Sequence, residues 1–161
     1  MPLSTEELLQ KYAAGDRDFA GTELDDVKFR DVDLSDINLT SASLDGAFFL
    51  GTNLQNATLK QANLIDSNFR QANLAQADLS GADLEGADLG GSNLAGANLE
   101  GANLKSASLR DVNLQDANLK HANLKGSALH NANLQGVQLE NTQLNGAYLK
   151  GTLLEETASQ T

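Results

Sequence analysis

The sequence predicts an all-β solenoid, in which the chain winds around a single apolar axis. Every fifth residue from Phe19 to Leu154 is Leu or Phe, without a polar interruption. A five-residue period matches neither the 3.6-residue period of an α-helix nor the two-residue period of a β-strand. A chain that turns a corner once per repeat keeps all of these side chains, here called the central residues, on one line.

The other positions of the repeat fit the same geometry. A small or β-branched residue stands two positions before each central residue, with Arg17 as the one charged exception. Asn or Asp usually comes directly before the central residue, and most of the 14 glycines come two positions after it. Glycine accommodates the positive φ of a type II turn, and Asn and Asp form local hydrogen bonds in turns. We therefore expect a core of central and small residues, with a corner between successive repeats.

One tract carries a family resemblance. Residues 72–104, ANLAQADLSGADLEGADLGGSNLAGANLEGANL, repeat A(D/N)LXX in nearly pure form. The chain resembles the pentapeptide-repeat family, especially its cyanobacterial single-domain members. This resemblance covers residues 18–154 and implies a right-handed quadrilateral β-helix with 20 residues per coil and about seven coils. Residues 1–17 would then form a capping helix with the entry to the first coil, and residues 155–161 a C-terminal tail.

A short α-helix is expected over residues 5–14. Ser4 and Glu7 have the spacing of a capping box, and Gly15 provides a C-terminal stop. Leu8 and its apolar neighbours share one face of this helix. The helix should cover the first coil, whose edge would otherwise offer unpaired N–H and C=O groups to another chain.

A 20-residue coil places residues of one kind above each other. Phe29, Phe49 and Phe69 should stack inside the rod, with Leu89 continuing the stack, and we favour this over a ligand pocket. On the outside, one column of asparagines should form a hydrogen-bonded amide ladder, with a recognition surface as the alternative. This column contains Asn53, Asn73, Asn93, Asn113 and Asn133.

Composition excludes several classes of function. The 22 acidic and 11 basic residues give a net charge of -11, which disfavours direct binding to nucleic acid or to an anionic membrane. The absence of cysteine excludes disulfides and thiolate metal sites. No apolar run approaches the roughly 18 residues of a membrane span, and the first residues lack the features of a secretory signal. We expect a cytoplasmic protein without a membrane segment.

No arrangement of residues indicates catalysis. The two histidines, His121 and His130, fall on different walls of a 20-residue coil, and their spacing is not that of a metal site. The glycines recur at turn positions rather than in a phosphate-binding loop. We therefore expect a protein that is not an enzyme, with no catalytic residues, no cofactor and no metal.

Two outward features are candidates for contact with a protein partner. Phe48 and Leu50 flank the central Phe49 and predict a small apolar patch, although single exposed apolar residues are common. The position after the central residue on the same wall carries a basic stripe that includes Arg30, Arg70 and Arg110. This stripe is either part of a solvated lattice of ion pairs or a docking face for an acidic partner.

The C-terminal end is a third candidate surface. Tyr148 and Leu153 occupy a position that is usually polar, and Leu154 follows as the last central residue. These residues predict an end-to-end contact, so the chain is expected to be a monomer or a C-terminal dimer.

The sequence supports two functions. The first is a non-enzymatic module that presents a rigid surface to an unknown protein partner. The second is an acidic mimic of DNA that binds DNA gyrase or a topoisomerase. The resemblance implies this alternative, because family members of the quinolone-resistance type bind gyrase by resembling duplex DNA.

Overall fold

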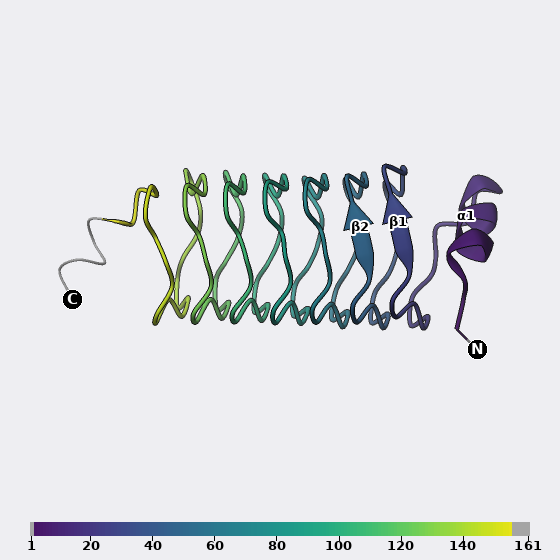
Figure 1. Ribbon diagram of the computed structural model, residues 1–161, viewed down its shortest axis with the longest axis horizontal. Coiled ribbons are helices and arrows are strands. Elements are labelled where there is room, and N and C mark those ends of the chain that lie inside the picture. The colour runs from purple at the N-terminus through teal and green to yellow at the C-terminus, as the bar shows by residue number, and fades with distance from the viewer. Residues whose placement is uncertain (1, 156–161) are drawn as a thin grey trace.

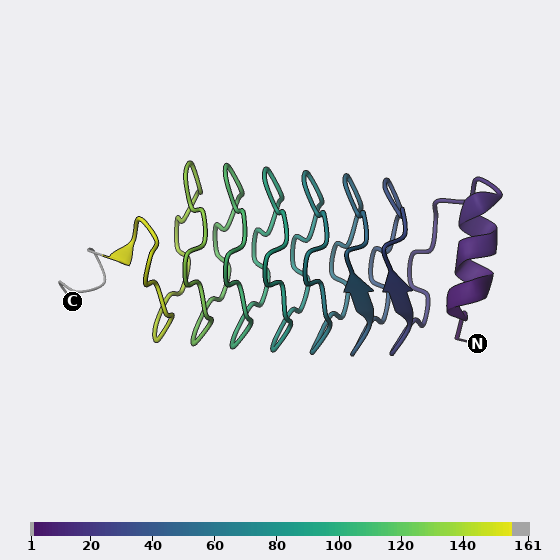
Figure 2. The same ribbon diagram turned by 45° about the horizontal axis from the view of Figure 1, so that its top comes forward.

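The protein is a rod of stacked coils with a helix across its N-terminal end (Figures 1 and 2). The computed structural model describes residues 2–155. The residue directly before a central residue pairs with the residue 20 positions later through a parallel bridge. These bridges run from Asp18 with Asn38 to Ala128 with Tyr148. One coil therefore contains four five-residue repeats and has four walls. The predicted β-helix with a small helix is confirmed.

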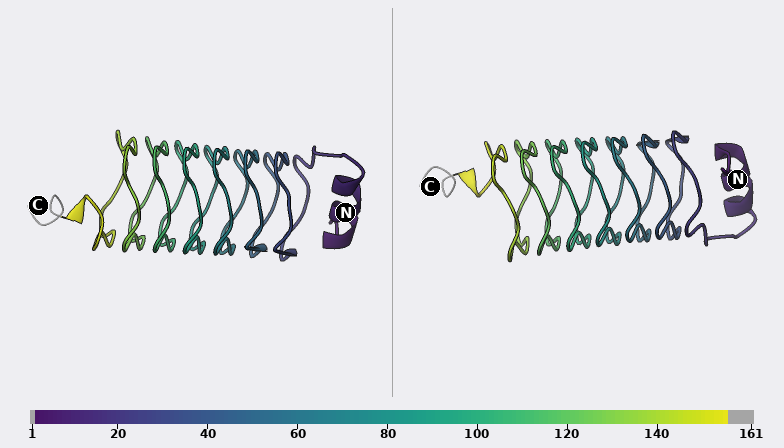
Figure 3. Two further views of the ribbon diagram at one scale, coloured as in Figure 1. Left: turned by 90° about the horizontal axis from the view of Figure 1, so that it is seen from above. Right: turned by 90° about the horizontal axis from the view of Figure 1, so that it is seen from below.

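Straight β structure is short because every repeat contains a bend. The strands β1 (Lys28–Arg30) and β2 (Phe48–Leu50) pair in parallel, with Phe29 opposite Phe49. Elsewhere in the described chain the coils meet through single-residue bridges. Each coil thus hydrogen-bonds to the coils before and after it, and the coils lie side by side along the rod (Figure 3).

The corners have one conformation throughout the rod. The residue two positions after the central residue has a positive φ in each repeat from Gly21 to Gly151. Glycine was expected here, yet residues such as Gln76 (φ 60°) and Asp66 (φ 53°) adopt the same conformation. This conformation costs a non-glycine residue roughly 1–2 kcal/mol. We attribute it to stacking, because pairing with the neighbouring coils requires the same turn at each level.

The core follows the predicted pattern. Central residues from Phe19 to Leu134 are buried, together with most of the small residues two positions before them. The expected aromatic stack is present: the ring centroids of Phe29 and Phe49 are 5.3 Å apart, and those of Phe49 and Phe69 are 4.8 Å apart. Both centroid distances lie in the range of favourable aromatic pairs, about 4.5–7 Å.

The N-terminal helix α1 (Thr5–Ala13) lies across the first coil, and it ends one residue earlier than expected. The Glu7 N–H donates to the Ser4 hydroxyl at 3.1 Å, and the Ser4 N–H donates to the Glu7 carboxylate at 2.9 Å. Leu8 is fully buried against the core. No helix within residues 2–155 is long and apolar enough to cross a membrane.

The C-terminal end differs from the rest of the rod. The central residues Leu139, Leu144, Leu149 and Leu154 pack against the core but stay half-buried. The expectation that every central residue is buried is therefore wrong for the last coil. The physical reason is that the described chain provides no further coil to cover them. The predicted tail beyond Glu155 lies outside the described residues.

Candidate interaction surfaces

Three walls of the rod carry amide ladders. On the wall with the predicted column, the Asn73 side-chain amide donates to the Asn53 carbonyl oxygen at 3.0 Å, and Asn53 donates to Asp33 at 2.9 Å. The same contact continues through Asn93 and Asn113 to Asn133. Each amide oxygen also accepts the N–H two residues later, as from Gln55 at 3.2 Å. The predicted ladder is confirmed, and shorter ladders follow two other walls.

The fourth wall is built differently, and we call it the basic wall. Its central residues are those of the phenylalanine stack and the leucines that follow in the same column. The residues before them form no amide ladder within residues 2–155: Lys28, Phe48, Asn68, Asp88, Ser108, Ala128 and Tyr148. The residues after them form the basic row: Arg30, Leu50, Arg70, Gly90, Arg110, His130 and Lys150.

The apolar pair on the basic wall is less exposed than the sequence suggested. Phe48 and Leu50 point outward from β2, but both are half-buried. Coils stack about 4.8 Å apart, so the side chains of adjacent coils shield one another. Phe48 and Leu50 therefore present the edges of an apolar surface between flanking polar residues.

The arginines of the basic row are exposed, and their ion pairs are few. Arg30 Nε lies 3.5 Å from Asp31 Oδ2, and both side chains are 72% exposed. Arg70 Nη1 lies 3.4 Å from Asp88 Oδ2. Arg110 has no ion pair within residues 2–155. The ion-pair lattice considered from the sequence thus accounts for only part of the row, and exposed pairs of this kind contribute little stability.

A glycine in the basic row gives an arginine room to lie flat. Gly90 is buried although it occupies an outward position, directly after the central Leu89. A Cβ atom at Gly90 would stand 3.3 Å from Arg70 Nη1 and 3.1 Å from Asp88 Oδ1. The Arg70 guanidinium therefore lies over Gly90, next to the Asp88 carboxylate with which it pairs. The five-residue pattern did not indicate this contact, because it joins residues in adjacent coils.

The basic wall reaches the C-terminal end through an aromatic contact. His130 stacks on Tyr148, with ring centroids 5.8 Å apart and planes inclined by 15°. The Nδ1 atom of His130 is enclosed and has no hydrogen-bond partner in the described chain. Tyr148 is 59% exposed and Leu153 is 65% exposed, whereas Leu154 is half-buried. The structure thus places Tyr148 and Leu153 at the surface of the last coil, on neighbouring walls.

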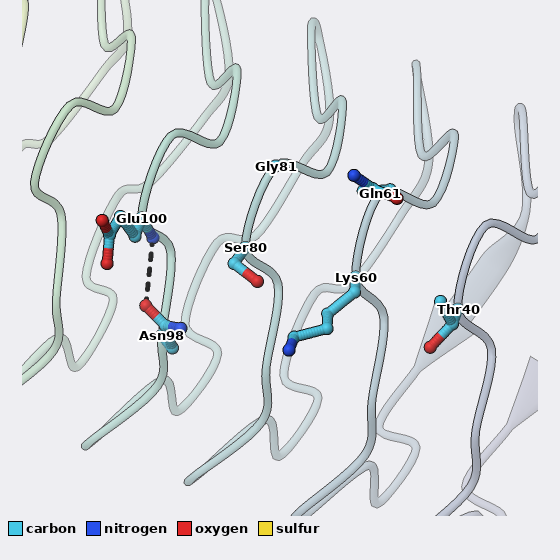
Figure 4. Close-up of a pocket in the computed structure, with 7 residues that line it drawn as sticks. All are labelled: Thr40, Lys60, Gln61, Ser80, Gly81, Asn98 and Glu100. Carbon is cyan, nitrogen blue, oxygen red and sulfur yellow. Dashed lines mark hydrogen bonds between the residues drawn. The ribbon is translucent and has the colours of Figure 1, made fainter.

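A shallow depression of about 500 Å³ lies on another wall, where small residues stand between longer ones (Figure 4). Ser80 and Gly81 form its floor, with Lys60 on one side and Glu100 on the other (Figure 4). Its other lining residues are Thr40, Gln61 and Asn98.

Three polar residues at this depression, Asp78, Ser80 and Lys60, are already partners of one another. The Asp78 carboxylate accepts the N–H and hydroxyl of Ser80 at 3.0 and 2.7 Å and lies 3.4 Å from Lys60 Nζ. Burial alone would raise the pKa of Asp78, but the two bonds from Ser80 and the Lys60 ammonium together lower it. No group of three or more potential metal ligands gathers within residues 2–155.

The repeat and its geometry decide the family. The family model for pentapeptide repeats matches in eight copies, over residues 22–61, 33–71, 52–91, 72–111 and 113–151. The chain belongs to the pentapeptide-repeat family. No curated protein matches it significantly.

Several solved structures are similar to this chain. One is a trypsin-treated form of QnrB1, a plasmid-mediated fluoroquinolone resistance protein, which is 22% identical to this chain with a TM-score of 0.60. The match covers 84% of this chain and 70% of the QnrB1 chain. The pentapeptide-repeat protein alr5209 from Nostoc PCC 7120 is 35% identical, with a TM-score of 0.48 and coverages of 76% and 84%. Rfr23 from the cyanobacterium Cyanothece 51142 is 31% identical, with a TM-score of 0.34 and coverages of 92% and 97%.

Proposed function

We propose that this pentapeptide-repeat chain is a non-enzymatic scaffold that presents a rigid surface to a protein partner, and that the partner docks on the basic wall. The observation that supports this most is the row containing Arg30, Arg70 and Arg110 on a chain of net charge -11. Cations gather there beside the half-buried Phe48 and Leu50. We also propose that the chain winds in a right-handed sense, that it forms about seven coils and that the protein is cytoplasmic.

The construction of the wall supports docking on physical grounds. Each coil is hydrogen-bonded to its neighbours, for example by the Phe49 N–H to the Asn68 carbonyl at 2.7 Å and the Phe48 N–H to the Val27 carbonyl at 2.8 Å. The backbone beneath the basic row is thus held in place before a partner arrives. A preorganised surface loses little conformational freedom on binding, so more of the contact energy appears as affinity.

Affinity capture with matched variants tests the docking face. The wild type is compared with a double variant, Phe48→Ser with Leu50→Ser, and with a single variant, Ile65→Ser. Ile65 is a half-buried apolar residue on a different wall. We expect a partner that the wild type and the Ile65 variant retain and the double variant loses. The partner is then purified, and its dissociation constant for each variant is measured. Equal affinity for all three proteins would remove Phe48 and Leu50 from the docking face.

Mimicry of DNA is the second candidate. The feature that favours it is the acidic surface of the N-terminal part, where Asp16, Asp18, Glu23, Asp25 and Asp26 are all exposed. Carboxylates spread over a rod can occupy a groove that normally binds duplex DNA. The test is a supercoiling assay with purified gyrase and a fluoroquinolone. A lack of both inhibition and protection at stoichiometric excess would discard this function.

We also propose that two copies associate through their C-terminal ends. In earlier coils the N–H of a central residue donates to the next coil, as from Leu129 to the Tyr148 carbonyl at 2.8 Å. Within the described chain, the N–H groups of Leu139, Leu144 and Leu149 have no such partner. This open edge lies beside the exposed Leu153. Since α1 covers the opposite end, association through open ends would stop at a dimer rather than continue as a fibre.

Light scattering at two concentrations tests this association. We expect the mass of the wild type to approach that of a dimer as concentration rises, and a Tyr148→Ser, Leu153→Ser variant to stay monomeric. A variant with Phe48→Ser alone should still dimerise, because its side chain lies far from the last coil. A wild type that is monomeric at both concentrations would contradict the proposal.

A further inference from the structure

We infer that the basic wall fits an acidic α-helix that lies along the rod axis and carries one carboxylate every seven residues. This inference rests on the proposed docking function and names the class of partner. Its starting point is the order of residues in the basic row. Arg30, Arg70, Arg110 and Lys150 stand in every second coil. The coils between them contribute Leu50, Gly90 and His130, which have no permanent charge.

The stacking of coils sets the distance between these cations. Parallel bridges join residues 20 positions apart, such as Phe48 with Asn68 and Asn68 with Asp88. Paired strands are about 4.8 Å apart, so the backbone positions of cations in every second coil are about 9.6 Å apart. An α-helix rises 1.5 Å per residue, and seven residues therefore span about 10.5 Å. The mismatch of roughly 1 Å per step is small compared with the reach of an arginine side chain.

Two other acidic partners, an extended β-strand and a nucleic acid, fit this surface less well. In an extended strand, side chains on one face repeat about every 6.7 Å, so neither one nor two such steps match 9.6 Å. A helix with one carboxylate per seven residues keeps its charges near one face, because the drift is only about 20° per seven residues. Nucleic acid is disfavoured because the chain carries a net charge of -11. Among these three partners, the helix is the one whose carboxylates meet successive cations along the rod.

The apolar residue between the first two arginines adds a further requirement. Leu50 lies one coil from Arg30 and one coil from Arg70, which is about three residues along a helix that lies parallel to the rod. The partner should therefore carry an apolar side chain three or four residues after a carboxylate. That side chain would contact Phe48 and Leu50, both half-buried at the edge of the core.

The cations are available for such a partner. Arg110 is exposed and has no ion pair within residues 2–155. The pairs of Arg30 with Asp31 and of Arg70 with Asp88 are exposed. Pairs of this kind contribute little stability, so an incoming carboxylate can replace one at small cost.

Binding of designed peptides tests the inference. The first peptide is an alanine-rich helix with glutamates at seven-residue intervals and one leucine between the first two. The second has the same composition, with the glutamates distributed around the helix, and the third is an extended polyglutamate. Each peptide is titrated by fluorescence anisotropy at low ionic strength, and circular dichroism confirms that the first two are helical.

Two charge-matched triple variants identify the wall. One has Arg30→Gln, Arg70→Gln and Arg110→Gln. The other has Lys60→Gln, Lys105→Gln and Lys125→Gln, which lie on other walls and change the net charge equally. We expect the wild type and the lysine variant to bind the seven-residue-spaced peptide about tenfold more tightly than the second peptide. The arginine variant should lose this preference and bind about tenfold more weakly.

The possible failures separate the two proposals. If all three peptides bind the wild type equally and only the arginine variant binds them weakly, the basic wall is a docking face but the helical partner is wrong. If the lysine variant loses as much affinity as the arginine variant, only net charge matters and both proposals fail for acidic partners. If the seven-residue-spaced peptide does not bind the wild type, the inference is overturned.

Discussion

Replacement of Leu94 by aspartate would test whether the central residues carry the fold. Leu94 lies in the middle of the rod and is 0% exposed, between Leu74 and Leu114 in the coils on either side, which are also 0% exposed. Truncation to alanine removes most of this buried side chain and costs about 2–5 kcal/mol. Aspartate adds a carboxylate without a partner in an apolar interior, so its cost exceeds that of alanine.

The expected magnitude is large relative to the stability of a domain, which is typically about 5–15 kcal/mol. Because each coil contacts only its two neighbours, damage at Leu94 separates the rod into two shorter stacks. We expect the alanine variant to unfold at lower urea concentration with a loss of about 2–5 kcal/mol. The aspartate variant should lose the middle coils at ambient temperature and show a reduced far-ultraviolet β signal.

Urea titration followed by circular dichroism, together with thermal melting, provides the measurement. A matched control is Leu144→Ala in the last coil, where the leucine is only half-buried. It removes the same atoms from a partly hydrated site, so its cost should be clearly smaller. Unchanged melting of the Leu94→Asp variant would refute the assignment of the central residues to the interior. Equal losses for the two alanine variants would refute the gradient of burial along the rod.

Three further changes have defined outcomes. Asn93→Ala removes two ladder bonds of 3.3 and 3.1 Å, and urea titration should show a loss of about 1–3 kcal/mol; no loss would mean that water replaces the ladder. The pKa of Asp78 is lowered in the folded protein. The ionised Asp78 carboxylate therefore stabilises the fold at pH values above its pKa in the unfolded chain, and this stabilisation is lost as the pH falls through its pKa in the folded protein. Asp78→Asn should therefore make the stability less dependent on pH below about 4, and an unchanged pH profile of melting would contradict this. Ser4→Ala removes the N-cap of α1 and should cost about 0.5–2 kcal/mol in the same urea assay; a loss below this range would show that the cap is not needed.

Much of the fold could be predicted from the sequence because the repeat is nearly perfect. The central position at Leu94, the small residue at Ala62 and the corner at Gly81 were each predicted from a column of the repeat, and each has the expected burial or φ. The helix at the N-terminus was predicted from its capping box, a local signal that depends only on residues three positions apart.

The candidate surfaces could be predicted only in part. Arg30 and Arg110 are exposed as expected, but Phe48 and Leu50 are more buried than their outward position suggested. The cover of Gly90 by Arg70 and the stacking of His130 on Tyr148 were missed. Both contacts join adjacent coils, and their strength depends on which way a long side chain turns along the rod.

The sequence by itself determined which side chains lie inside the rod, which form its corners and which face outward, because these properties repeat every five residues. The tertiary structure decided which residues stand above one another, including the phenylalanine stack, the amide ladders and the alternation of the basic row. The physical reason is that these contacts depend on the number of residues in a complete coil. That number is set by hydrogen bonding between coils, and a five-residue period does not contain it.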